Sequence, residues 1–142
     1  FWYKDIMVVD DYAHHPTEVR ATLQAARSGP VRRVIVVFQP HRYSRTKWFL
    51  DDFPEAFAAA DKVILTNIYA ASEQPLAGVS SRELADRMRK RGIDVTEIDD
   101  VEEIIKYALS LLQPGDLLIT MGAGDVTEIG HRLANCLKAK YL

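Results

Sequence analysis

Five consecutive apolar residues, VIVVF at positions 34–38, constrain the fold of this chain more than any other stretch. A strand with one face in water alternates apolar and polar residues, whereas an unbroken apolar run is typical of a strand that is buried on both faces of a parallel sheet. A similar stretch, DLLITM at 116–121, lies near the end of the chain. We therefore expect a sheet that is covered by helices on both sides.

Helical patterns alternate with strand-like patterns along the chain. We expect strands at 5–9, 34–38, 62–66, 94–98 and 116–121, and helices at 16–27, 44–60, 80–91, 101–112 and 125–140. Strands that are joined by helices pair in parallel through right-handed crossovers. The predicted fold class is therefore α/β, a Rossmann-like open, mostly parallel sheet of five or six strands with helices on both faces.

Several local features refine these elements. Pro54 is expected to kink or split the helix at 44–60, and Ser80 and Asp125 are expected to cap the helices that follow them. Residues 1–4 either extend the first strand or belong to a hairpin whose other half is missing. Residues 67–79 form a long loop.

Length and composition exclude some classes of protein. The 142 residues are enough for one domain with a core, and 48% apolar with 27% charged residues is the mixture of a soluble globular protein. A net charge of -2 favours neither nucleic acid nor an anionic membrane as a partner. The single cysteine, Cys136, forms no internal disulfide, so a cytoplasmic location is expected. Because the chain begins with Phe1, we expect it to be a piece of a longer protein.

The first chemically unusual turn is DDYAHH at 10–15. Pro16 suits the first position of a helix, which places His15 near the N-cap. Asp10 and His15 fit a turn-forming role and a ligand-binding role equally well. Asp11 fits ligand binding better, because the strand should release its side chain over the edge of the sheet, where ligands bind. The spacing matches no strong zinc pattern, so no metal site is predicted.

The second unusual turn, FQPHRYSRTK at 38–47, is rich in cations. With Ser44 as the N-cap, Arg42, Arg45 and Lys47 crowd the positive end of a helix, where cations are unfavourable. An anion bound at this point would explain them, because backbone N–H groups and guanidinium groups can converge on a carboxylate or phosphate. The alternative is a solvated basic turn. We favour the anion site.

The third turn, TMGAGDVTE at 120–128, contains Gly122 and Gly124, which permit close approach of a ligand. It lacks the third glycine of a dinucleotide-binding fingerprint, and a tight turn capped by Asp125 explains much of it. The sequence also contains no phosphate-binding loop of the G-x-x-x-x-G-K-[ST] type. These three turns therefore predict an anion-binding rim that has no catalytic centre of its own.

Four segments resemble the C-terminal domain of the Mur ligases, and within that family the members that add L-alanine. They are DDYAHHPTEV at 10–19, FQPHRYSRT at 38–46, YAASEQPLAGVSSRELA at 69–85 and MGAGDV at 121–126. The resemblance covers essentially the whole chain, as a single domain of residues 1–142. It implies a three-domain enzyme in which the N-terminal and central domains lie outside this chain.

The resemblance also implies the reaction. ATP phosphorylates the carboxylate of UDP-N-acetylmuramate, and the amine of L-alanine attacks the acyl phosphate to form an amide during peptidoglycan synthesis. ATP and Mg²⁺ would be held mainly by the central domain. The resemblance therefore implies a cytoplasmic ligase whose C-terminal domain has no catalytic residues of its own and is inactive in isolation.

The resemblance assigns roles to eight residues. Asp11 and His14 would contact ATP. Arg42 and Arg45 would bind the carboxylate of L-alanine, with Tyr12 and His41 beside them, and Gly122 and Gly124 would border the same cleft.

Two other functions stay open. A muropeptide-recycling Mur ligase shares the first segment, but we expect a different sequence in place of HRYSRT. A non-catalytic α/β module that binds a nucleotide or an anion is the other alternative.

Overall fold

The unbroken apolar runs form the middle of a six-stranded sheet in the computed structural model, which describes residues 2–141. The strands are β1 (Trp2–Tyr3), β2 (Ile6–Asp11), β3 (Arg33–Phe38), β4 (Lys62–Leu65), β5 (Val95–Glu97) and β6 (Asp116–Met121). Their order in the sheet is β1-β2-β6-β3-β4-β5, and β1 alone is antiparallel to its neighbour. The predicted α/β fold class is confirmed.

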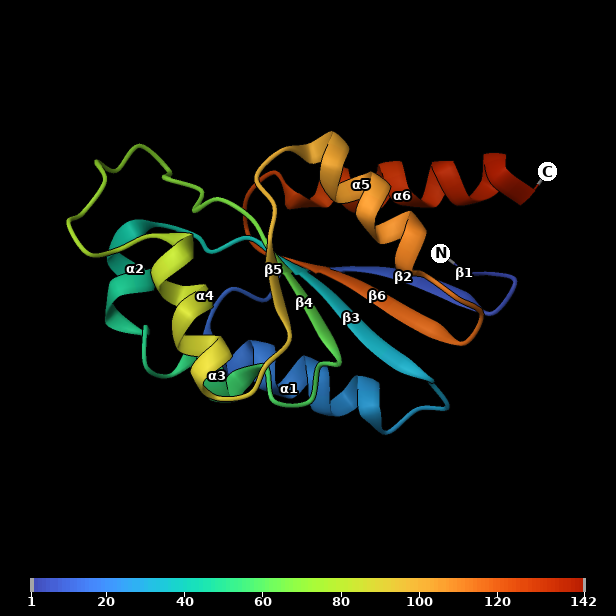
Figure 1. Ribbon diagram of the computed structural model, residues 1–142, viewed down its shortest axis with the longest axis horizontal. Helices are drawn as coiled ribbons and strands as arrows, with labels where there is room; N and C mark the ends of the chain where they lie inside the picture. The colour runs from blue at the N-terminus through green and yellow to red at the C-terminus, as the bar shows by residue number, and fades with distance from the viewer. Residues whose placement is uncertain (1, 142) are drawn as a thin grey trace.

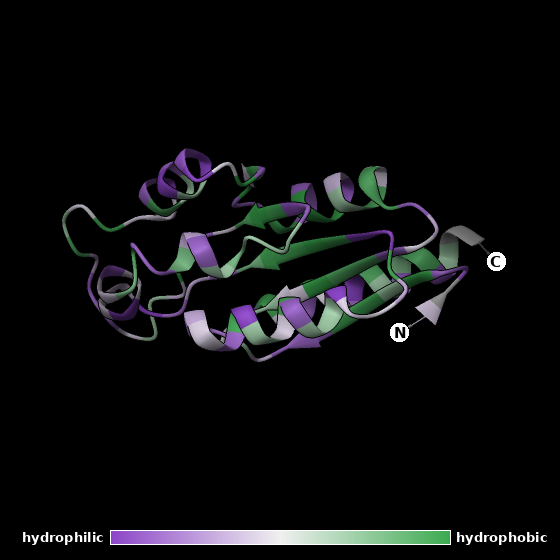
Figure 2. Ribbon diagram, turned by 90° about the horizontal axis from the view of Figure 1, so that it is seen from below, coloured by the Kyte–Doolittle hydropathy of each residue, from purple (hydrophilic) through white to green (hydrophobic). Residues whose placement is uncertain are grey.

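Helices cover both faces of this sheet (Figure 1). One face carries α1 (Pro16–Arg27), α3 (Phe53–Ala56) and α4 (Ser81–Lys90), and the other carries α5 (Val101–Leu111) and α6 (Val126–Tyr141). The short helix α2 (Tyr43–Trp48) lies beyond the ends of the strands. The strands of the sheet are mostly hydrophobic, whereas the helices mix hydrophobic and hydrophilic residues (Figure 2).

The apolar run of β3 shows why both layers are needed. Val34, Val36 and Phe38 pack with α1, α3 and α4, whereas Ile35 and Val37 pack with α5 and α6. All five side chains are fully buried. A strand buried on both faces needs apolar residues at successive positions, because successive side chains point to opposite faces.

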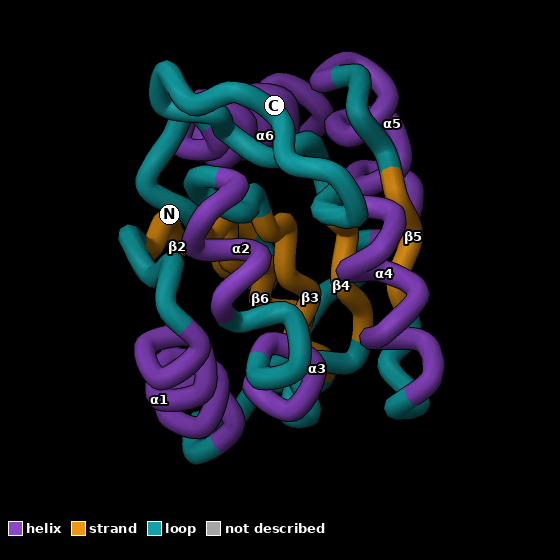
Figure 3. The backbone as a smooth tube through the Cα atoms, turned by 90° about the vertical axis from the view of Figure 1, so that its left-hand side faces the viewer, coloured by secondary structure: helices purple, strands orange, loops and turns teal. Residues whose placement is uncertain are grey.

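The last strand, β6, lies between the first two parallel strands. It pairs with β2 on one side and with β3 on the other, so that Met121 is opposite both Asp11 and Phe38. The carboxyl ends of these three strands are therefore neighbours, and the three unusual turns of the sequence meet at one edge of the sheet. Figure 3 looks onto this edge.

Local capping signals are mostly confirmed. His15 caps α1, since its Nδ1 accepts the N–H of Thr17 at 3.1 Å, and Glu18 completes a capping box. Ser80 caps α4 by accepting the N–H of Glu83 at 3.1 Å. At the start of α6, however, the N–H of Val126 donates to Oε1 of the distant Gln39 at 3.2 Å.

In three places the structure differs by more than one residue from the ranges expected from the sequence. The segment predicted as a helix at 44–60 forms two helices, α2 and α3, and Pro54 lies in the first turn of α3, so the expectation that Pro54 kinks or splits this segment is confirmed as a split. Strand β2 continues through Asp10 and Asp11, because its ladder with β6 extends to Met121. Residues 2–3 form a hairpin with β2, so both halves are within the chain; Phe1 is outside the described residues.

A buried ion pair joins the start of β3 to the start of β6. The side chain of Asp116 is inaccessible to solvent, and its two oxygens accept from Nε of Arg33 at 3.0 Å and from Nη2 of Arg33 at 2.5 Å. The N–H of Gln113 donates to the same carboxylate at 2.9 Å. The hydrogen bond that Arg33 donates to Asp116 raises the pKa of Arg33. This pair anchors the amino edge of the sheet.

None of the helices in residues 2–141 is long and apolar enough to cross a membrane.

Candidate functional site

Four aromatic rings form a row along the carboxyl edge of the sheet, and we call Tyr12, His14, His41 and Tyr69 the ring row. Tyr12 and His14 have centroids 5.1 Å apart, His14 and His41 are 5.9 Å apart, and His41 stacks on Tyr69 at 5.5 Å and 13°. These residues follow β2, β3 and β4. The structure therefore brings His41 of the second turn beside Tyr12 and His14 of the first turn.

Backbone hydrogen bonds hold the far end of the row. The N–H of Tyr69 donates to the carbonyl of Pro40 at 2.8 Å, and the N–H of Arg42 donates to the carbonyl of Tyr69 at 2.7 Å. His41 and Tyr69 consequently pair as in a parallel sheet beyond the ends of β3 and β4. The position of the Arg42 backbone is thus tied to the loop at 67–79.

Arg45 and His41 form the polar centre of the site. Nη1 of Arg45 donates to Nδ1 of His41 at 3.0 Å, so the imidazole is neutral and carries its proton on Nε2. Burial, followed by the charge of Arg45, lowers the pKa of His41 below its ordinary value.

Histidine titration by NMR should show this effect. The midpoint of His41 is expected below the ordinary value of about 6.5, and Arg45→Ala is expected to move it part of the way back, because burial is the larger cause. Since the folded state lowers this pKa, His41 contributes stability above about pH 6.5 that is lost as the pH falls through the folded pKa. An unchanged midpoint in Arg45→Ala would contradict the contact.

Arg42 has an unusual backbone conformation for a non-glycine residue. Its φ is 72° and its ψ is 140°, in a region that is populated almost exclusively by glycine. Within residues 2–141, its exposed guanidinium has no hydrogen-bond or ion-pair partner. A strained backbone that presents unpaired donors at the carboxyl edge indicates a binding role, since such strain concentrates at functional sites.

Because of this strain, we expect glycine to be more stable than alanine at position 42, the reverse of the usual order within a helix. Arg42→Gly should be about 1 kcal/mol more stable than Arg42→Ala, because alanine keeps the strained conformation and glycine relieves it. At the neighbouring helical position Lys47, the glycine variant should be less stable than the alanine variant by a similar amount. Urea denaturation of the four variants measures both differences. The same order at both positions would show that the backbone at Arg42 is unstrained.

The predicted anion site at the start of α2 needs correction. Ser44 is not the N-cap; the helix begins at Tyr43, and the N-cap residue Arg42 makes no side-chain cap. In this six-residue helix Arg45 and Lys47 lie in the last turn, where cations are favourable. The anion at the first turn is internal, because the carboxylate of Glu73 accepts from the N–H and the hydroxyl of Ser44. The helix dipole therefore gives no reason to expect an external ligand.

Both aspartates of the first turn have internal partners. Asp11 accepts the N–H of Ala13 at 2.7 Å and the hydroxyl of Thr22 at 3.2 Å. Asp10 accepts the hydroxyl groups of Thr120 at 2.7 Å and Thr127 at 3.1 Å. Each carboxylate thus shapes the edge, Asp11 by joining its own turn to α1 and Asp10 by reaching across to β6 and α6.

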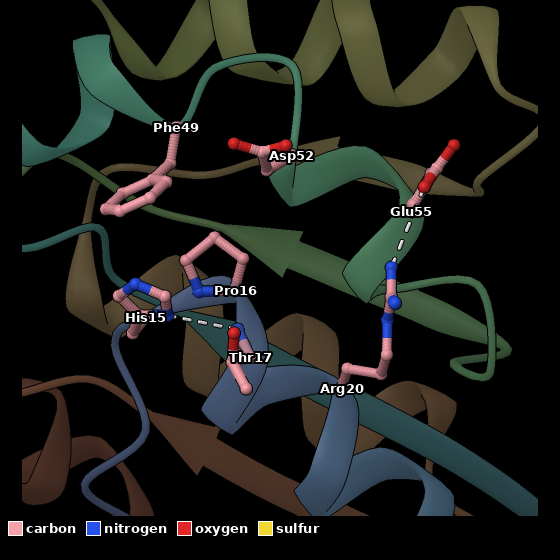
Figure 4. A pocket seen from close by; sticks show the side chains of 7 residues that line it. All are labelled: His15, Pro16, Thr17, Arg20, Phe49, Asp52 and Glu55. Carbon is pink, nitrogen blue, oxygen red and sulfur yellow. Dashed lines mark hydrogen bonds and ion pairs between the residues drawn. The ribbon is translucent and has the colours of Figure 1, made fainter.

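The two adjacent histidines point to different places. Nδ1 of His14 bonds the carbonyl of Tyr12 at 2.8 Å, which places the proton on Nδ1 when the ring is neutral and leaves Nε2 as an acceptor. His15 instead packs edge-on against Phe49, with ring centroids 4.4 Å apart. Figure 4 shows His15 beside Phe49 in a hollow of about 250 Å³ between α1 and α3, whose lining includes no residue of the ring row.

The two glycines after β6 leave room for other residues of this chain, which a side chain at either position would displace. A Cβ atom at Gly124 would lie 2.7 Å from Oε1 of Gln39 and 2.7 Å from Cγ of Tyr69. One at Gly122, where φ is 153°, would lie 2.9 Å from the carbonyl oxygen of Gln39. Both glycines therefore permit the close approach of Gln39 and Tyr69, which the sequence interpretation had attributed to a ligand.

A second hollow, of about 530 Å³, opens at the same edge between the ends of β3 and β4 and the starts of α5 and α6. Tyr69 belongs both to its lining and to the ring row. In the part of the chain that is described, no group of three or more His, Cys, Asp or Glu side chains could hold a metal ion.

Comparison with known proteins identifies the family. A family model described as "Mur ligase, glutamate ligase domain" matches residues 2–124. The chain belongs to the Mur ligase family. The resemblance that was based on four short segments of the sequence is thereby confirmed at the level of the family.

Curated relatives refine this Mur ligase assignment. The chain is 51% identical over 136 residues to the UDP-N-acetylmuramate–L-alanine ligase of Geotalea uraniireducens, and 52% identical over 127 residues to that of Caldanaerobacter subterraneus. These matches cover 95% and 89% of the chain but only 30% and 28% of the relatives. The chain therefore spans less than a third of the length of these ligases.

Solved structures agree with the family. The UDP-N-acetylmuramate–alanine ligase of Thermotoga maritima superposes with a TM-score of 0.76 at 26% identity, over 96% of this chain and 28% of that one. An isolated domain of a putative tripeptide-adding ligase from Haemophilus ducreyi superposes with a TM-score of 0.66 at 22% identity, over 94% of this chain and 93% of that one. The second match shows a shared fold.

Two residues that shape the candidate site were missed by sequence reasoning. Glu73 and Gln39 lie in segments that had been quoted, but neither received a chemical role. Their partners, Ser44 and Val126, are 29 and 87 positions away. No local spacing rule relates residues so far apart.

Proposed function

We propose that this chain is the C-terminal domain of an ATP-dependent ligase that joins L-alanine to UDP-N-acetylmuramate through an acyl phosphate in peptidoglycan synthesis. The observation that carries the proposal is the 51% identity, over 95% of the chain, to a relative with this name. The domain contributes the amino-acid pocket and part of the ATP site, and the rest of a longer cytoplasmic protein holds the UDP-sugar.

The reaction divides between domains. The γ-phosphoryl group of ATP passes to the muramoyl carboxylate with release of ADP, and the neutral amine of L-alanine then attacks the acyl carbon. The tetrahedral intermediate collapses to the amide and expels phosphate. Mg²⁺ would neutralise charge on the transferred phosphoryl group. Residues 2–141 offer no cluster of ligands for this ion, so we assign it to the remainder of the protein.

Arg42 and Arg45 are our candidates for the L-alanine carboxylate. The Arg42 guanidinium is exposed with its donors unpaired, and Arg45 uses one donor on His41. Guanidinium groups bind carboxylates through paired N–H donors, which fix the orientation of the amino acid. Tyr12 and His41 flank this position in the ring row, and burial, followed by the charge of Arg45, lowers the pKa of His41 there.

Asp11 and His14 are our candidates for the ATP side of the site, on the family resemblance. The Asp11 carboxylate has further lone pairs beyond the two that Ala13 and Thr22 occupy, so a ribose hydroxyl could donate to it without breaking either bond. Nε2 of His14 is likewise an open acceptor beside Tyr12. Gly122 and Gly124 border this cleft indirectly, by admitting Gln39 and Tyr69.

Turnover assays test the proposal. The full-length protein is expected to release ADP when UDP-N-acetylmuramate, ATP, Mg²⁺ and L-alanine are all present. The isolated 142-residue domain is expected to be inactive, because it has no phosphate-binding loop. Preference for an L-alanyl tripeptide over L-alanine would instead indicate the recycling ligase, and a full-length protein that releases no ADP would indicate a binding module.

A further inference from the structure

The loop that follows β4 contains two adjacent residues with left-handed backbone. Ala71 has a φ of 51° and Ser72 a φ of 73°, and the N–H of Glu73 closes the turn on the carbonyl of Ala70 at 3.0 Å. Tight turns with positive φ at both central positions usually contain Gly, Asn or Asp. A turn of this kind made from alanine and serine persists only where its surroundings hold it.

Glu73, the residue that closes this turn, contacts Ser44 at the start of α2. Its Oε1 accepts the N–H of Ser44 at 3.1 Å, and its Oε2 accepts the Ser44 hydroxyl at 2.5 Å. These two bonds are the main causes of a lowered pKa of Glu73, and the charge of Arg42 lowers it further. The carboxylate is therefore ionised at neutral pH and bridges the loop to the first turn of α2.

Helix α2 depends on this bridge. It has only six residues, and its N-cap residue, Arg42, makes no side-chain hydrogen bond to the helix. So short a helix is not stable by itself. Its start is held by the Arg42–Tyr69 backbone bond, by the Thr46 hydroxyl on the Arg42 carbonyl at 2.8 Å, and by Glu73.

We propose that Glu73 is a positioning residue for the amino-acid substrate: its hold on Ser44 orients the first turn of α2 so that Arg42 and Arg45 face one carboxylate. Arg42 precedes the helix by one residue, and Arg45 is the third residue of the helix. A shift of the helix start would therefore move both guanidinium groups. This inference rests on the proposed L-alanine site.

Two other roles for Glu73 predict different kinetics. A carboxylate that competes with the substrate for Arg42 would give a lower KM for L-alanine when it is removed. A carboxylate that only stabilises the fold would leave every KM unchanged and lower the melting temperature. A positioning carboxylate raises the KM for L-alanine alone.

The test is steady-state kinetics of the full-length protein with Glu73→Ala, Glu73→Gln and Ser44→Ala. We expect Glu73→Ala to raise the KM for L-alanine about ten-fold and to leave the KM values for ATP and UDP-N-acetylmuramate within two-fold. Glu73→Gln should restore part of the loss, because its amide oxygen still accepts the Ser44 N–H. Glu73→Ala combined with Ser44→Ala should be no worse than Glu73→Ala alone. Gln74→Ala, an exposed neighbour in the same loop, is the matched control.

Failures of the two proposals are distinguishable. A wild-type protein without L-alanine-dependent turnover overturns the proposed function. A wild-type protein that ligates L-alanine, together with a Glu73→Ala variant whose KM for L-alanine is unchanged or lower, overturns the positioning role alone. Hydrogen exchange adds a readout that is independent of activity: the amide of Ser44 should exchange faster in Glu73→Ala than in wild type, and equal exchange rates overturn the bridge.

Discussion

Arg45→Ala in the full-length ligase is expected to lose tens-fold or more in kcat/KM for L-alanine. Removal of one partner of a desolvated charge pair costs about 2–5 kcal/mol, and each factor of ten corresponds to about 1.4 kcal/mol. Arg45 also donates to His41, so its loss releases the imidazole that flanks the pocket. Arg42→Ala should behave similarly. Steady-state kinetics in which each substrate is varied in turn measures the effect.

The KM values of the other substrates and two further variants show whether the loss in Arg45→Ala comes from L-alanine binding. The KM for UDP-N-acetylmuramate should change little, because our proposal assigns that substrate to another part of the full-length protein. Arg45→Lys should recover only part of the loss, since lysine lacks the paired donors of a guanidinium. Arg82→Ala removes an exposed arginine of α4 outside the site and should leave the kinetics unchanged. If the loss falls on ATP or the UDP-sugar instead, the arginines bind a phosphate and the L-alanine assignment is wrong.

Arg33→Ala is expected to destabilise the domain by about 3 kcal/mol, because it leaves the carboxylate of Asp116 buried without its main cation. The Asp116 side chain is 0% exposed, whereas that of Arg33 is 28% exposed, so the carboxylate has no route to solvent. For a domain of this size the melting temperature should fall by roughly 6–12 °C. Thermal and urea denaturation of the isolated domain measure both quantities.

A surface ion pair provides the control for Arg33→Ala. Arg20 lies 3.6 Å from Glu55, and both side chains are more than half exposed. Exposed pairs contribute about 0–1 kcal/mol, so Arg20→Ala should change stability only slightly. Equal losses in the two variants would mean that burial of Asp116 does not set the cost. Recovery of stability in the double variant of Arg33→Ala with Asp116→Asn would support the explanation.

The sequence by itself determined the parts of this protein that depend on neighbouring residues. An unbroken apolar run specifies a strand buried on two faces, because side chains alternate across a strand. Pro16 with His15, and Ser80 with Glu83, specify helix starts, because a cap bonds residues two or three positions away. The alternation of strands and helices specifies a parallel sheet, and so the carboxyl edge at which the turns meet.

Only the tertiary structure decided how the site is assembled at that edge. The insertion of β6 between β2 and β3 brings three distant turns together. The start of α2 depends on Glu73, which is 29 positions from Ser44, and the glycine turn depends on the side chains of Gln39 and Tyr69. The sequence pattern had placed Arg45 at the positive end of a helix, and these long-range contacts place it at the other end. Helix ends are marginal in energy, so whichever partner the fold brings to them sets where they lie.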